Sequence, residues 1–98
     1  MNITKKLNEK ELCLSLEGRL DTTTAPQLEA EINNCITGLS SLVLDFGGLE
    51  YISSAGLRVV LAAQKEMNKH GSMVVRNVCE DIMEVFDITG FVDILTIE

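Results

Sequence analysis

One segment, residues 42–61, constrains the fold more than any other part of this 98-residue chain. It reads LVLDFGGLEYISSAGLRVVL, so an apolar run of strand type passes through small and acidic residues into an apolar run of helix type. The pair Gly47-Gly48 predicts a sharp turn after the strand, and the small residues 53–56 predict a helix start. A helix start leaves backbone N–H groups free for an anion or a partner surface. We therefore expect the functional site in the loop of residues 45–56.

Periodicity on either side of this segment predicts strands that alternate with helices. Residues 2–7 and 11–16 alternate apolar and polar side chains around a short polar turn, which is typical of a β-hairpin. The resulting order β-β-α-β-α-β-α-β implies an α/β fold, with a mixed parallel and antiparallel sheet of four to five strands and helices packed against it. The other predicted helices and strands are a helix that contains Pro26 and ends at Gly38, one that ends at Gly71, one over 80–86 that ends near Gly90, and strands at 42–46, 72–76 and 91–97.

Composition and charge narrow the class of protein. The length and the 46% hydrophobic content fit one compact domain. With 15 acidic and 8 basic residues the formal charge is −7, which disfavours nucleic-acid binding and favours protein partners. No apolar run approaches the roughly 18 residues that span a bilayer, so we expect no membrane insertion and a cytoplasmic location.

Residues that usually carry catalysis or bind metals are sparse. Cys13, Cys35 and Cys79 lie far apart beside apolar residues, which argues against a paired metal motif and favours packed, reduced thiols. His70 is the only histidine, and it lies near the predicted end of a helix, where a cation suits the helix dipole. We therefore expect no metal, no cofactor and no enzymatic activity.

Four short motifs occur in the order and spacing of STAS domains. They are Glu17-Gly18-Arg19-Leu20-Asp21, Leu42-Val43-Leu44-Asp45, Ser53-Ser54-Ala55-Gly56-Leu57 and Phe86-Asp87-Ile88-Thr89-Gly90-Phe91. The chain resembles a stand-alone bacterial anti-sigma factor antagonist, and the resemblance implies a single STAS domain over residues 1–98. In that family the dephosphorylated antagonist binds an anti-sigma factor that is also a serine kinase of GHKL-like type, and a sigma factor is released. Phosphorylation of a serine at the start of the second helix breaks the contact.

The chain departs from the family at the position that normally accepts the phosphate. The family pattern is Asp-Ser-Ser-Gly or Asp-Ser-Thr-Gly, whereas Ala55 precedes the glycine here and Ser53 replaces the acid. One residue step along a helix turns the side chain by about 100°, so Ser54 does not automatically replace the missing acceptor. Three hypotheses follow: Ser53 or Ser54 caps the helix, Ser54 or Ser53 is phosphorylated, or Ala55 keeps the chain permanently competent to bind.

The resemblance also implies a partner-binding surface around the second helix start. Asp21 matches the acid that ends the family's Gly-x-Leu-Asp motif, where a carboxylate would meet a basic residue of the anti-sigma factor. Alternatively, Asp21 is a cap beside the threonines that begin at Thr22. The candidate partner-binding residues are Asp21, Thr22, Ser53, Ser54, Ala55, Gly56, Leu57 and Arg58.

Other uses of the same module stay open. Similar STAS proteins are subunits of membrane transporters, scaffold signalling complexes or regulate phosphatases, so a transporter, a signalling complex and a phosphatase are also candidate partners. Many antagonists continue into a further helix after the last strand, whereas this sequence stops at Glu98. We therefore expect an exposed patch around Phe86 and Phe91 that supports a weak homodimer.

Overall fold

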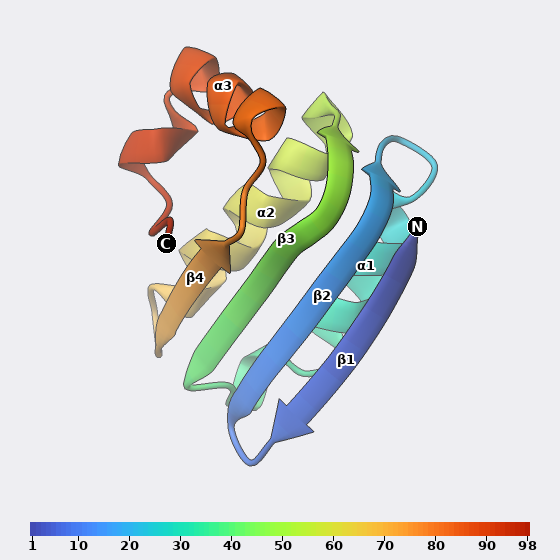
Figure 1. Ribbon diagram of the computed structural model, residues 1–98. Helices are drawn as coiled ribbons and strands as arrows, with labels where there is room; N and C mark the ends of the chain where they lie inside the picture. The colour runs from blue at the N-terminus through green and yellow to red at the C-terminus, as the bar shows by residue number, and fades with distance from the viewer.

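The sheet has four strands in the order β1-β2-β3-β4, and the computed structural model describes residues 1–98 (Figure 1). Strands β1 and β2 are antiparallel, whereas β3 pairs in parallel with both β2 and β4. The predicted α/β fold with a mixed sheet and an antiparallel edge is confirmed. The strands are β1 (Asn2–Asn8), β2 (Glu11–Leu20), β3 (Ser41–Ile52) and β4 (Ser72–Arg76), the α-helices are α1 (Ala25–Asn33), α2 (Ser54–Met67) and α3 (Glu80–Thr89), and the 3-10 helices are η1 (Ile36–Gly38) and η2 (Phe91–Asp93).

Helices α1 and α2 cover one face of the sheet. Figure 1 shows both helices behind the strands, while the face towards the viewer carries no helix and α3 lies beyond the end of β4. The period of two along the central strands explains this arrangement, because every second side chain points towards the helices. The buried residues of β2 and β3 include Leu12, Leu14, Leu16, Leu20, Leu42, Leu44 and Phe46.

Strand β3 continues through Gly47-Gly48, so the turn predicted there is wrong. Neither glycine has a positive φ. Instead, the β2–β3 pairing shifts register between Ser15 and Glu17, and Gly48 pairs with Glu17. A Cβ atom at Gly48 would lie 2.6 Å from Glu17 Cγ and 3.1 Å from the Leu16 carbonyl oxygen. Gly48 therefore permits a close approach of two strands at a bulge, and the predicted loop shrinks to the junction of β3 and α2.

The last predicted strand is reduced to one bridge. Residues after Gly90 form η2, and only Ile97 pairs in parallel with Val75 of β4. The amide N of Val75 donates to the Thr96 carbonyl oxygen at 2.9 Å, and the Glu98 amide donates to the Val75 carbonyl oxygen at 2.9 Å. Because η2 occupies the start of the segment, too few residues remain to extend along β4.

Two of the predicted helix ends differ from the structure. α1 ends at Asn33, and Gly38 instead ends η1. α2 ends at Met67, four residues before Gly71, whose amide donates to the Met67 carbonyl oxygen at 2.7 Å. At the third helix the prediction is confirmed, since Gly90 has φ 81° and forms the left-handed end of α3.

The aromatic residues near the C-terminus belong largely to the core, contrary to the predicted exposed patch. Phe86 is fully buried, and its ring centroid lies 6.3 Å from those of both Phe46 and Phe91. Phe91 is half-buried. The apolar side chains that are exposed in this region are Ile88, Val92 and Ile94. The homodimer stays a prediction, but the residues first named for its contact are wrong, because Phe86 packs inward from α3.

Candidate functional site

The two predicted site segments meet at the carboxyl ends of β2 and β3. These strands are parallel, and Leu20 and Ile52, their last residues, are paired. The Ser53 amide donates to the Leu20 carbonyl oxygen at 2.9 Å, which links the turn after β2 to the start of α2. The parallel pairing therefore places Asp21 and Ser53 on the same end of the sheet, as the α/β pattern requires.

Asp21 organises the turn that leads into α1. Its Oδ1 atom accepts hydrogen bonds from Thr23 Oγ1 at 2.7 Å, the Thr23 amide at 3.0 Å and the Thr24 amide at 3.1 Å. The Thr23 hydroxyl contributes most to holding the pKa of the Asp21 carboxyl below its usual value, and the amides of Thr23 and Thr24 act in the same direction. Asp21 thus fixes the turn before α1, whereas the N-cap residue of the helix is Thr24, which makes no side-chain cap hydrogen bond. Its role in binding a partner stays a prediction.

The three small residues at the start of α2 lie in different environments. Ser53 is the N-cap, and its Oγ atom accepts from the Gly56 amide at 3.3 Å. Ser54 is the first helical residue, and its side chain is exposed. Ala55 is half-buried and lines a small depression of about 200 Å³ together with Thr22 and Arg58. The cap hypothesis is thus confirmed for Ser53.

Gly56 and Leu57 belong to the interior of the site. A Cβ atom at Gly56 would lie 2.7 Å from Leu20 Cγ and 3.0 Å from Ile52 Cγ1, because the helix start presses against both strand ends. Leu57 is only 8% exposed, which leaves little of its side chain for a partner to touch. Leu57, one of the candidate partner-binding residues, therefore packs mainly into the core. Arg58 is exposed.

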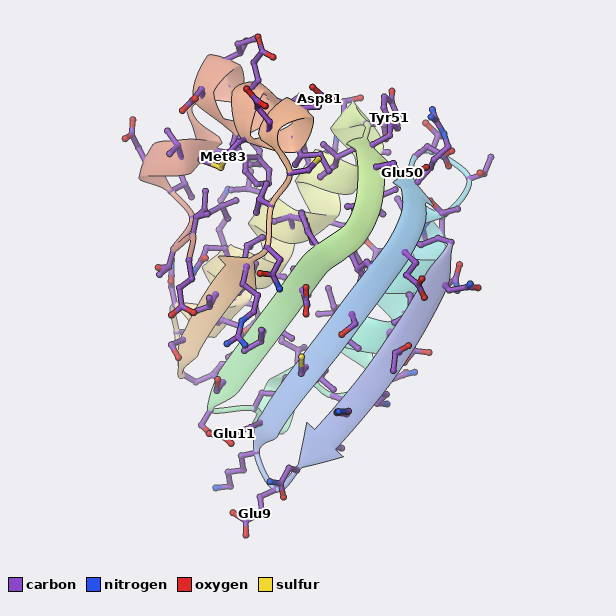
Figure 2. All side chains as sticks on the ribbon, in the orientation of Figure 1. Glu9, Glu11, Glu50, Tyr51, Asp81 and Met83 are labelled. Carbon is purple, nitrogen blue, oxygen red and sulfur yellow. The ribbon has the colours of Figure 1, made fainter.

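Arg19 and Tyr51 form a further part of this end of the sheet that the sequence analysis did not select. The two residues are paired across β2 and β3, and the Arg19 guanidinium lies 4.1 Å from the Tyr51 ring centroid. Arg19 Nε also lies 3.9 Å from Asp21 Oδ2. Figure 2 shows Tyr51 and its neighbour Glu50 where β3 leads into α2. Alternation on parallel strands was the signal that could have found this pair.

Asp45 lies outside the site, which corrects the expected extent of the loop. Its Oδ1 atom accepts from the Gly47 amide at 2.9 Å and from Asn77 Nδ2 at 3.0 Å, and Asn77 has a left-handed φ of 58°. The hydrogen bond from Asn77 is the main cause that holds the pKa of the Asp45 carboxyl below its usual value. Asp45 therefore fixes β3 to the turn after β4 and does not reach Ser53.

The residues considered for metal binding or redox chemistry are dispersed. No group of three or more His, Cys, Asp or Glu side chains is placed to hold a metal ion. All three cysteines are free, and Cys79 is exposed, contrary to the predicted packing, because it precedes α3 at the surface. His70 Nδ1 lies 2.8 Å from the Leu39 carbonyl oxygen. None of the helices is both long enough and apolar enough to cross a membrane.

Comparisons with known proteins agree on one family. The STAS domain model matches residues 2–98. The Bordetella bronchiseptica protein BtrV is 38% identical over 99 residues, covering 99% of this chain and 85% of BtrV. The Bacillus subtilis anti-sigma-B factor antagonist is 30% identical over 98 residues, covering 99% of this chain and 90% of that protein. The structure of the anti-sigma factor antagonist SpoIIAA in its unphosphorylated form superposes with a TM-score of 0.86 at 20% identity, covering 99% of this chain and 88% of SpoIIAA.

Proposed function

Because this chain belongs to the STAS domain family and is an anti-sigma factor antagonist by homology, we propose that it binds an anti-sigma factor and so frees a sigma factor. The partner is an anti-sigma factor that is also a serine kinase of GHKL-like type, and the two proteins meet in the cytoplasm. An antagonist of this kind is a non-enzymatic regulator that acts through partner switching.

The observation that carries this proposal is the position of the α2 start beside the Asp21 turn. Asp21, Ser54 and Arg58 give this end of the sheet exposed or half-exposed polar groups, and the small side chain of Ala55 lines a depression with Thr22 and Arg58. Such a surface suits a partner that offers one basic side chain and a complementary ridge. Thr22 and Ser53 complete the contact at its edge, while Gly56 and Leu57 support it from inside.

Ser54 is the stronger phosphorylation candidate of the two serines. Its side chain is exposed, whereas the Ser53 hydroxyl accepts the Gly56 amide as a cap. A phosphate would add about two negative charges at a helix start, where the dipole tolerates them but a closely packed partner surface would have to desolvate them. Incubation of the chain with ATP and the kinase partner, followed by peptide mapping, tests this directly. Absence of phosphate on both Ser54 and Ser53 would contradict it.

The binding surface itself is tested by placing a charge at Ala55. We expect Ala55→Asp to weaken binding to the anti-sigma factor about tenfold or more, because a carboxylate in the depression stays desolvated in the complex. Isothermal titration with the purified anti-sigma factor measures the affinity. Ala55→Ser, which adds a neutral hydroxyl of similar size, is the control and should bind within about threefold of the wild type. Equal affinity of the aspartate variant and the wild type would place the contact elsewhere.

Ala55 also favours a second candidate function. Without a hydroxyl at the family's usual acceptor position, the same surface suits a STAS adaptor that is not phosphorylated, in a signalling complex or attached to a membrane transporter. Affinity capture from the native cell distinguishes the two functions. Recovery of a serine kinase with a sigma factor supports the antagonist, and recovery of a permease supports the adaptor.

A further inference from the structure

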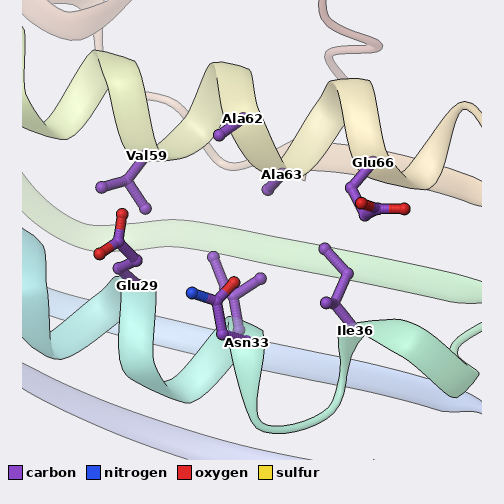
Figure 3. Close-up of a pocket in the computed structure, with 8 residues that line it drawn as sticks. Glu29, Asn33, Ile36, Val59, Ala62, Ala63 and Glu66 are labelled. Atoms are coloured by element: carbon purple, nitrogen blue, oxygen red, sulfur yellow. The ribbon is translucent and has the colours of Figure 1, made fainter.

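A groove runs between α1 and α2, and none of the residues assigned above to the antagonist surface lines it. Figure 3 shows its two walls, with Ile36 and residues of α1 on one side and residues of α2 on the other. The floor is apolar, because Ile32, Ile36, Val59 and Ala63 are each less than 9% exposed. Ala62 and Ala63 have short side chains, so the α2 wall leaves an open volume of about 190 Å³.

The size of this groove suits a single side chain. Pockets that bind cofactors or other small molecules usually enclose about 300 to 1,000 Å³. The groove is smaller than that range and is partly open to the surface. A long side chain with an apolar stem and a polar end is the class of group that such a shape accommodates.

Charge at the rim selects a basic end group. Glu29 and Glu66 stand at the rim of the groove, and Figure 3 shows the Glu29 carboxylate directed across it towards Val59. The Glu66 carboxylate lies 3.8 Å from Lys69 Nζ and 3.6 Å from His70 Nε2. The Glu29 carboxylate, by contrast, has no cation within 4.0 Å. The whole chain carries a formal charge of −7, which adds to the attraction for a cation.

The groove also continues into the antagonist surface. Glu29 and Val59 line both the groove and the depression that contains Thr22 and Ala55. A partner seated on the start of α2 therefore lies next to the groove.

We propose that the groove between α1 and α2 receives a lysine or arginine side chain of a protein partner, whose stem lies on Ile32 and Val59 and whose charge pairs with Glu29. The identification of that partner as the anti-sigma factor rests on the proposed function. The groove itself is a separate claim, because its apolar floor and its carboxylate rim do not involve the serines of the α2 start.

The first arm of the test uses a small probe. The ¹⁵N-labelled chain is titrated by NMR with an acetylated, amidated peptide of alternating leucine and arginine, and with the same peptide carrying citrulline, which is uncharged. We expect saturable shifts at the amides of Val59 and Ala63 with arginine, and affinity reduced about threefold by Glu29→Gln, as for an exposed ion pair. Equal shifts with citrulline, or shifts confined to another surface, would overturn the groove proposal.

The second arm uses the anti-sigma factor and a matched charge control. Glu84 on α3 is exposed like Glu29 and lies away from the groove, so Glu84→Lys changes the net charge equally. We expect Glu29→Lys to weaken binding about tenfold and Glu84→Lys less than twofold. Equal losses would show a net-charge effect and reject the groove as part of this interface. An anti-sigma factor that does not bind the wild-type chain would reject the proposed function, while the peptide titration still decides the groove.

Discussion

The two helix starts that meet at the end of β2 and β3 are built in different ways. Before α1, the Asp21 Oδ1 atom accepts hydrogen bonds of 2.7 to 3.3 Å from the amides and hydroxyls of Thr23 and Thr24. Before α2, Ser53 Oγ accepts a single bond of 3.3 Å from the Gly56 amide. A charged acceptor forms shorter and stronger hydrogen bonds than a hydroxyl, so the turn before α1 is held more firmly than the cap of α2.

This difference separates two tasks within one surface. A carboxylate fixed by its own turn can present charge to a partner in a constant geometry. A helix start with a light cap and an exposed serine can accept a modification without disturbing that turn. The structure of the α2 start depends instead on close packing, since Gly56 lies against Leu20 and Ile52.

The largest effect should come from breaking that packing. We expect Gly56→Val to lower the free energy of unfolding by about 3 kcal/mol, because its side chain collides with Leu20 and Ile52. Urea denaturation measures the loss. Gly38→Val is the control, since a Cβ atom there meets nothing within 4 Å, and it should change stability by about 0.5 kcal/mol or less. Equal losses in the two variants would contradict the proposed packing.

Removal of the Asp21 hydrogen bonds in the turn before α1 should have the next largest effect. We expect Asp21→Ala to lower the melting temperature by roughly 5 °C, because the amides of Thr23 and Thr24 lose their acceptor. Thermal unfolding followed by circular dichroism measures the shift. Asp87→Ala on α3 is the matched control, as Asp87 is exposed and its carboxylate makes no hydrogen bond. A larger shift for Asp87→Ala would refute the assigned role of Asp21.

Protonation in acid should weaken the hydrogen bonds that the Asp21 and Asp45 carboxylates accept in the wild-type chain. The folded-state pKa values of Asp21 and Asp45 lie below the ordinary value of 3.8. The stability that these carboxylates contribute is therefore complete above that value and is lost as pH falls through the lowered pKa values. Urea denaturation at pH 7, 5, 4 and 3 should show the loss mainly below pH 4, and Asp21→Asn should reduce it. A stability that stays constant from pH 5 to pH 3 would contradict the expectation.

The smallest effects should come from the two serines, and they sharpen the contrast most directly. We expect Ser53→Ala to cost about 0.5 to 1 kcal/mol through loss of the cap. Ser54→Ala should leave stability unchanged or raise it by a few tenths of a kcal/mol, because alanine is the better helix former. Chemical denaturation of both variants makes the comparison. If Ser54→Ala proved the more damaging, the cap would have been assigned to the wrong residue.

Local patterns predicted the parts of the fold that depend on periodicity. Alternation in residues 2–7 and 11–16 specified the hairpin, and Gly90 correctly predicted the left-handed end of α3. The Ser53 cap could also be predicted from the sequence, because a small polar residue directly before an apolar helical run is a typical helix N-cap.

Errors arose where a residue serves a neighbour that is distant in sequence. Gly47-Gly48 has the composition of a turn, yet Gly48 serves the bulge opposite Glu17, which no local pattern specifies. Phe86 looked like part of an uncovered surface, but it packs against Phe46 of β3. Arg19 and Tyr51 become neighbours only once the register of β2 and β3 is known. Pairing between strands, and not propensity, was the missing information in each β-sheet case.

The half-buried position of Ala55 has a consequence for how regulation is gained or lost. Serine and alanine codons differ by one nucleotide, and the added hydroxyl would face the depression that Ala55 lines with Thr22 and Arg58. The neighbouring Gly56 and the Ser53 cap would stay as they are. A single base change therefore adds a hydroxyl to this surface while the cap and the close packing around it are kept.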